Sequence, residues 1–264
     1  MFNNKHLKSI QKYDSLLYRN MIHLLTIYIN VLQSYDLIFY GITEEKVMYH
    51  YVDDKEFLGR MKRLCSDIVN QLVQKINREE KLQVRADLVG SGAKNLITQN
   101  ANNPIDLDYN LEILKSYEYD IYDGRSLKKY IGEKFNEVLR EHDWSNCDFS
   151  SSVFTTEQRY FVEGNQTRFS IDICVVTRMN GRWQRLICEK TGFISEDKFY
   201  WNAAPCSKKL MKKVEWIKKN GKWQELRVVY LKKKNQYLTR NDYAHSSFNV
   251  YIESVHEIYY KYCH

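Results

Sequence analysis

The sequence contains few of the residues that break or loosen a fold. Only 10 glycines and 2 prolines occur among its 264 residues, which excludes long flexible linkers, proline-rich stalks and collagen-like repeats. A formal net charge of +7 with 44% apolar residues also excludes the weakly hydrophobic composition of a disordered chain. The length therefore predicts one large folded domain, or two domains that share an interface.

Signals for thiolate chemistry and for membrane targeting are missing as well. The 6 cysteines form no Cys-x-x-Cys pair, so neither a zinc ribbon nor a redox motif is predicted. The most apolar stretch, residues 22–32, is about half as long as a membrane-spanning helix. The first residues also lack the pattern of a signal peptide. We therefore expect reduced thiols, a cytoplasmic protein and no membrane partner.

Hydrophobic periodicity predicts helical ends and a sheet-forming middle. Apolar residues at steps of three and four indicate helices, whereas alternating or β-branched stretches indicate strands. The predicted helices cover residues 5–38, 54–78, 126–140, 207–219, 223–238 and 243–262. The predicted strands cover residues 82–89, 105–113, 159–162 and 169–177.

This order predicts an α/β (α+β) fold in which helices clasp a mixed sheet. We expect residues 1–200 to hold N-terminal helices and a core whose sheet covers about residues 80–200. Residues 201–264 would form a C-terminal helical lobe. Within that region, residues 205–240 carry twelve Lys or Arg against Glu215 and Glu225, so the basic character of the chain is concentrated there.

Three carboxylates occupy positions that favour chemistry. Asp106 and Asp108 are two residues apart on a predicted strand, which puts them on the same face. Asp172 is the acidic residue of a strand otherwise fit for a sheet centre. A buried carboxylate needs a partner or a metal, and hard oxygen ligands suit Mg²⁺. The alternatives are a solvated strand face for the first two residues, and a structural ion pair of Asp172 with Arg168 or Arg159.

A Gly-Ser turn precedes these carboxylates. Gly90 and Ser91 end a predicted strand and can present backbone N–H groups and a hydroxyl to an anion. An apolar residue, Gly-Ser, a gap, Asp-x-Asp and a later Asp form a pattern that resembles nucleotidyltransferases of the DNA polymerase β type. The resemblance implies that Gly90 and Ser91 hold phosphates. It also implies that Asp106, Asp108 and Asp172 are catalytic residues holding two Mg²⁺ or Mn²⁺ ions.

The C-terminal region resembles the branch that contains cyclic GMP–AMP synthase, oligoadenylate synthetase and their bacterial relatives. By position, the resemblance implies that Arg227 and Ser247 hold the outer phosphates of a nucleoside triphosphate and that Phe248 stacks on its base. The alternatives are that Arg227 is an ordinary surface arginine, and that Ser247 begins a helix whose Phe248 is a core aromatic. The resemblance covers about residues 55–260.

The sequence thus predicts a metal-dependent enzyme that transfers a nucleoside monophosphate from ATP, GTP or another triphosphate to a hydroxyl, releasing pyrophosphate. Linear and cyclic oligonucleotide products both stay open. A nucleotide or other small molecule is favoured as acceptor, because lysine-rich helix faces are commonly just solvated. The alternatives are a nucleotide- or RNA-binding pseudoenzyme on the same fold, and a transferase that modifies a polynucleotide.

Overall fold

The computed structural model describes residues 48–192, 196–204, 208–242 and 245–263. The helix predicted over residues 5–38 lies outside these ranges. Around the sheet, the helices are α2 (Lys55–Arg78), the short α3 (Gly90–Lys94) and α4 (Gly124–Glu141), and the C-terminal helices are α5 (Lys208–Lys219), α6 (Trp223–Thr239) and α7 (Ser247–Tyr262). The strands are β1 (His50–Tyr51), β2 (Leu82–Leu88), β3 (Thr98–Gln99), β4 (Ile105–Ser116), β5 (Asp148–Phe149), β6 (Val153–Thr155), β7 (Phe169–Met179), β8 (Arg182–Glu189) and β9 (Lys198–Ala203).

A mixed sheet forms the centre of the described fold, as predicted. Its strands run in the order β2-β4-β7-β6-β5, with β8 also pairing to β7 and β9 to β8. The neighbours β4 and β7 are parallel, whereas the other pairs of this sheet are antiparallel. A separate two-stranded ladder joins β1 to β3. The α/β class predicted from the order of elements is therefore confirmed.

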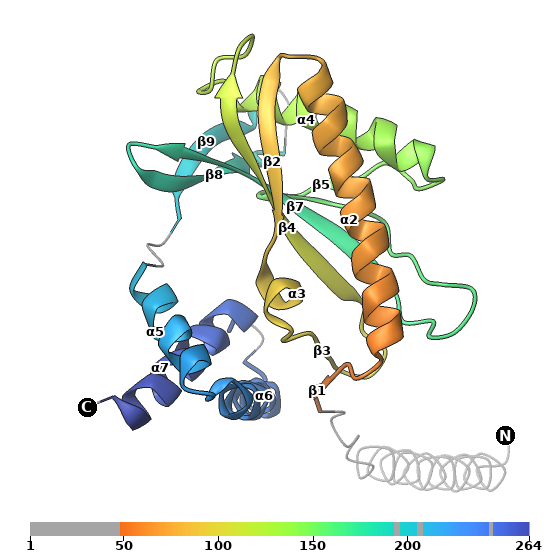
Figure 1. Cartoon of the computed structure of the whole chain (residues 1–264). Helices are drawn as coiled ribbons and strands as arrows, with labels where there is room; N and C mark the ends of the chain where they lie inside the picture. Colours follow the sequence, from red (N-terminus) through yellow and green to blue (C-terminus); the bar gives the residue numbers. More distant parts are fainter. Residues whose placement is uncertain (1–47, 193–195, 205–207, 243–244, 264) are drawn as a thin grey trace, which may run out of the picture. The chain divides into compact units, whose positions relative to one another are not determined.

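One face of the sheet is covered and the other is left for the site. Helices α2 and α4 lie side by side against the sheet (Figure 1), and their apolar faces pack on residues such as Leu107, Leu111 and Ile171. The side chain of Asp54 begins α2 by accepting a hydrogen bond from Phe57 N at 2.9 Å, as an N-cap does. The polar residues of β4 and β7 consequently occupy the opposite face.

The helices α5, α6 and α7 form a lobe with a hydrophobic cluster of its own, which contains residues such as Leu226, Tyr230 and Val255. Leu96, from the segment after α3, belongs to this cluster. The next residue, Ile97, belongs to the sheet cluster. The loop between α3 and β4 therefore joins the two hydrophobic clusters.

Two parts of the predicted secondary structure differ from the structure. Residues 159–162 make only an isolated bridge between Arg159 and Phe169. The aromatic Phe161 instead packs on Phe57 and Phe169, with ring centroids 6.0 and 5.1 Å apart. Six observed strands were missing from the prediction. Strands β1, β3, β5 and β6 have only two or three residues each and are too short to show a period, and the partial burial of β8 and β9 gives no clean alternation.

Candidate active site

The three predicted carboxylates lie on the same face of the sheet. Asp106 and Asp108 alternate along β4 with the buried Leu107 and Tyr109, as a strand requires. Asp108 is the register partner of Asp172 on the parallel strand β7. Two strands far apart in sequence thus bring Asp108 and Asp172 side by side, and Asp106 lies one pleat away.

The carboxyl groups of Asp108 and Asp172 are incompletely paired. Oδ1 of Asp172 is shielded from water and has no hydrogen-bond partner. Burial raises the pKa of Asp172, with a smaller raising effect from Asp106 and an opposing one from the hydroxyl of Thr155. Burial, followed by the charges of Asp172 and Asp106, raises the pKa of Asp108 to about 6. A ligand that supplies positive charge would relieve both groups.

Asp106 has a different environment. It is exposed, and its Oδ1 accepts a hydrogen bond from the hydroxyl of Ser170 on β7. Among the described residues, no group of three or more His, Cys, Asp or Glu side chains is arranged to hold a metal ion. The three carboxylates therefore do not make a complete metal site by themselves, and a cation here would need further ligands.

The Gly-Ser turn lies directly against Asp108. The backbone N–H of Val89 donates to the carbonyl oxygen of Asp108 at 2.8 Å. Gly90 has a φ of +62°, and a Cβ at this position would collide with the Asp108 carboxylate. Glycine is thus required both by the left-handed backbone and by the close approach. Helix α3 starts here and presents Ser91 to the same cavity.

Two lysines that the sequence analysis did not select also line the cavity. Lys94 of α3 donates to the carbonyl oxygen of Gly90 at 2.9 Å. Lys234 of α6 donates to Thr98 Oγ1 at 2.8 Å, and its Nζ lies 3.9 Å from the ring centroid of Tyr49. Burial lowers the pKa of Lys94, and it lowers the pKa of Lys234 to about 8. Lys234 has only neutral groups as described partners, so its ammonium lacks a compensating anion.

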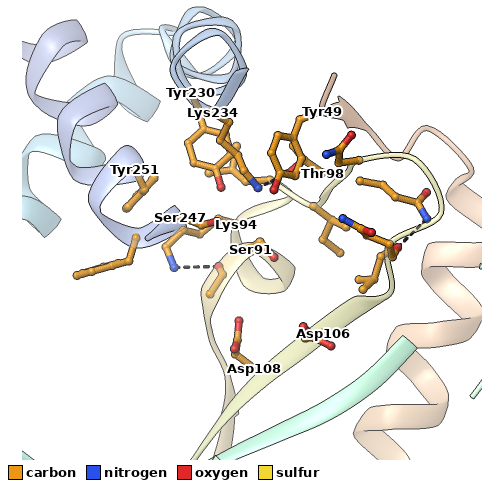
Figure 2. A pocket seen from close by; sticks show the side chains of 18 of the residues that line it. Tyr49, Ser91, Lys94, Thr98, Asp106, Asp108, Tyr230, Lys234, Ser247 and Tyr251 are labelled. Carbon is orange, nitrogen blue, oxygen red and sulfur yellow. Dashed lines mark hydrogen bonds between the residues drawn. The ribbon is translucent and has the colours of Figure 1, made fainter. Parts of the chain in front are cut away.

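The sequence offered a weak signal for one of these lysines and none for the other. Lys94 lies four residues after Gly90, on the turn that was already a candidate anion site. Lys234 follows two other lysines on α6, and nothing in the sequence distinguishes it from Lys232 or Lys233. Only the fold shows that Lys234 lines the same cavity as the carboxylates (Figure 2).

The predicted lobe residues divide into two groups. Ser247 and Phe248, at the start of α7, both line the cavity, and Phe248 is 48% exposed. Arg227 is not among the lining residues. Its guanidinium carbon lies 4.1 Å from the ring centroid of Tyr51, whose hydroxyl donates to the carbonyl oxygen of Arg227 at 2.8 Å. Arg227 thus joins α6 to β1, and Lys234 supplies the cavity cation that we expected from Arg227.

The cavity itself has a volume of about 470 Å³, within the range of small-molecule sites. The carboxylates lie on one side of it and the lobe on the other (Figure 2). The predicted site residues that it brings together are Gly90, Ser91, Asp106, Asp108, Asp172, Ser247 and Phe248.

The structural alternative for Asp172 is not supported. Arg159 pairs instead with Glu157, with Nη1 and Oε1 2.9 Å apart, and no ion pair to Asp172 occurs within the described ranges.

Among the residues that the structure describes, no helix is both long and apolar enough to span a membrane.

No protein-family model matches the chain, and no curated protein does so either. Solved structures do match. E. coli CdnC with ATP is 16% identical with a TM-score of 0.48, and the match covers 78% of this chain and 60% of CdnC. Bradyrhizobium diazoefficiens CD-NTase CdnG in complex with GTP is 14% identical with a TM-score of 0.36, covering 55% and 38% of the two chains.

Vibrio cholerae DncV, a cyclic AMP-GMP synthase solved with a linear intermediate, is 13% identical with a TM-score of 0.39. The match covers 57% of this chain and 37% of DncV. This chain thus spans 60% or less of each of the three proteins. DncV is described as a prokaryotic homologue of cGAS.

Proposed function

We propose that this protein is a metal-dependent nucleotidyltransferase that transfers a nucleoside monophosphate from a nucleoside triphosphate to a hydroxyl, with release of pyrophosphate. The observation that carries the proposal is the arrangement of charge in one cavity. Paired carboxylates near the starts of β4 and β7 share the cavity with a Gly-Ser turn and two partly buried ammonium groups. A metal-bound triphosphate complements both sides, since it carries negative phosphates and a divalent cation.

The phosphates would bind at the cationic side. Ser91 would donate its hydroxyl to a phosphate oxygen, next to a glycine that lets the backbone come close. Lys94 and Lys234 would supply the charge, and Ser247 would add a hydroxyl from the lobe. Binding an anion would give Lys234 the counter-charge that its buried ammonium lacks. Arg227 is left out of this clamp because it stacks on Tyr51.

The carboxylates fit a divalent cation completed by substrate oxygens. Asp106, Asp108 and Asp172 would hold it, since Mg²⁺ prefers oxygen ligands and shares them with phosphates. The buried, unpartnered Oδ1 of Asp172 and the mutual repulsion of the three groups support this fit. When bound, two Mg²⁺ or Mn²⁺ ions would supply positive charge to the attacking and the leaving oxygen.

The remaining roles belong to groups at the cavity edge. Asp172, bound to the metal on the acceptor side, would also help to take the proton of the acceptor hydroxyl. The exposed ring of Phe248 would stack on a nucleobase. We propose a nucleotide or another small molecule as acceptor, and a linear or cyclic oligonucleotide is the product class implied by the sequence resemblance.

The experiment is incubation with each labelled nucleoside triphosphate and Mg²⁺ or Mn²⁺, with products resolved by mass. Asp172→Asn should abolish transfer. Asp87→Asn is the matched control, because Asp87 is an exposed carboxylate of β2 that pairs with Arg85 at 3.2 Å outside the cavity. Triphosphate binding without turnover would support the pseudoenzyme instead, and activity in Asp172→Asn would refute the catalytic assignment.

A further inference from the structure

One wall of the cavity differs in chemistry from the others. The segment from Leu96 to Ile105 contains no charged residue, although most of its residues line the cavity. Three of these carry side-chain amides, namely Gln99, Asn100 and Asn103. Figure 2 shows the chain running from Thr98 around one side of the cavity to Asp106. An uncharged amide wall therefore stands beside the cationic and anionic parts of the site.

Asn100 has an unused hydrogen-bond acceptor in this wall. Its Oδ1 is shielded from water and has no hydrogen-bond partner. A buried polar atom without a partner costs free energy that a ligand donor could recover. The terminal torsion of an asparagine side chain is broad, so the carboxamide can rotate toward a ligand. This rotation breaks no hydrogen bond of Oδ1, because Oδ1 has none.

The backbone that carries Asn100 is held in place by its neighbours. The N–H of Asn103 donates to the carbonyl oxygen of Asn100 at 3.1 Å, and Nε2 of Gln99 donates to the carbonyl oxygen of Asn103 at 2.9 Å. Between them, Ala101 has a φ of +49°, which closes the turn. The wall is thus a preformed surface with one adjustable carboxamide.

The chemistry of the wall indicates which part of a nucleotide it takes. Phosphates belong with Lys94 and Lys234, so the uncharged wall is left for a nucleobase. Among side chains that read base edges, Arg and Lys pair with guanine, carboxylates pair with cytosine, and Asn or Gln pair with adenine. The segment from 96 to 105 offers the cavity three amides and the Thr98 hydroxyl for such pairing, and that hydroxyl already accepts a hydrogen bond from Lys234.

We infer that this wall is an adenine subsite in which Asn100 accepts a hydrogen bond from the exocyclic 6-amino group. The inference rests on the proposed function, because it assumes that a nucleotide occupies the cavity. It goes further by naming the base and the side chain that distinguishes it. Asn100 is a specificity residue in this assignment, and it takes no part in the transfer of the phosphoryl group.

The test compares two ligands that differ only in the amino group. The α,β-methylene analogues of ATP and of purine riboside triphosphate cannot be cleaved at the α–β bond, so equilibrium binding in Mg²⁺ is measured without turnover. The protein should bind the adenosine analogue about tenfold or more tightly than the purine riboside analogue. Asn100→Leu should remove this difference by weakening the adenosine analogue alone.

Asn102→Leu is the matched control, because Asn102 is an exposed residue of the same turn and does not line the cavity. It should keep the difference between the two ligands. If Asn100→Leu does not fold, the same measurement is made on Asn100→Ala, whose side chain is smaller than that of asparagine. Equal weakening of both analogues by Asn100→Leu, or unchanged binding of both, would overturn the inference. Tighter binding of the α,β-methylene analogue of GTP than of the ATP analogue, measured with the unaltered protein under the same conditions, would also overturn it.

The outcome separates this inference from the proposed function. If no nucleoside triphosphate analogue binds the unaltered protein, the proposed function fails and the adenine subsite fails with it. If substitution of Lys234 weakens the binding of an analogue and substitution of Asn100 leaves its affinity unchanged, only the adenine subsite fails.

Discussion

Asp108 and Asp172 are register partners on adjacent parallel strands, β4 and β7. In most sheets such a pair would combine opposite charges or apolar groups, since like charges directly opposite each other are destabilising. Here two partly buried carboxylates face the same cavity, and burial and mutual repulsion raise the pKa of Asp108 to about 6. The arrangement weakens the free protein and favours a cationic ligand.

Asp108→Asn should therefore stabilise the metal-free protein at about pH 8. The raised pKa means that the unfolded chain loses its proton near pH 4, whereas the folded chain holds it to about pH 6. Stability contributed by this group falls as pH rises from about 4 to 6 and stays low above that range. The difference of about 2 pKa units corresponds to up to about 3 kcal/mol.

Denaturant unfolding in EDTA at several pH values measures this effect. The stability gap between Asp108→Asn and the unaltered protein should narrow as pH falls from about 6 to about 4 and close below about 4, where the folded and the unfolded states are both protonated. A gap that persists in acid, or no gap at about pH 8, would show that the Asp108 carboxylate carries no such cost.

Gly90→Ala should disrupt both the fold and the site. Alanine would adopt an unfavourable left-handed backbone, and its Cβ would push against the Asp108 carboxylate. Gly221→Ala is the matched control, because Gly221 has a similar φ of +67° with open space around it. The control should cost about 1–2 kcal/mol from backbone strain. Gly90→Ala should cost roughly 1–3 kcal/mol more and abolish transfer, as thermal unfolding and transfer assays would reveal.

Lys234→Met should weaken triphosphate binding by roughly 10–100-fold, since a hydrogen bond to a charged group contributes about 1.5–3 kcal/mol. The free protein should become more stable, because the variant no longer buries an uncompensated ammonium. Lys232→Met is the control, since Lys232 is an exposed residue of the same helix. Calorimetric titration with a non-cleavable triphosphate measures the affinity. Equal effects of the two variants would remove Lys234 from the phosphate site.

Tight polynucleotide binding is not expected. Lys209 and Lys212 of α5 are exposed, whereas Lys213 is occupied by a hydrogen bond of 2.8 Å to the Tyr260 hydroxyl. Binding of RNA or DNA should stay weak at physiological salt. A salt dependence with a logarithmic slope of about −3 or steeper, flattened in a Lys209→Gln and Lys212→Gln double variant, would instead indicate a transferase that modifies polynucleotides.

The sequence predicted the parts of the site that local pattern determines. Alternation along β4 places Asp106 and Asp108 on one face, and a Gly-Ser turn after a strand is visible in the residues themselves. The pairing of Asp108 with Asp172 needed a resemblance to a known family, since register between distant strands is not a local property.

The lobe was harder to predict because burial of a helical cation depends on packing. Arg227 and Lys234 both lie on α6, seven positions apart; the resemblance pointed to Arg227, and of the two residues only Lys234 lines the cavity. The guanidinium of Arg227 stacks on the ring of Tyr51. Tyr51 belongs to β1, a strand of two residues that is too short to show a hydrophobic period in the sequence. Asn100 likewise belongs to an asparagine-rich segment in which the sequence does not distinguish it; in the structure it lines the cavity and its Oδ1 has no hydrogen-bond partner.

The position of Leu96 and Ile97 has a consequence for how substrate reaches the site. These consecutive residues are buried in different hydrophobic clusters, so the sheet and the lobe cannot part at this seam without exposing one of two apolar side chains, at a cost of about 1.5–3 kcal/mol. The seam therefore resists opening of the cavity beside Leu96 and Ile97, which both line it. Under the proposed function, a nucleotide would enter where Phe248 and Asp106 are exposed to solvent, and pyrophosphate would leave by the same route.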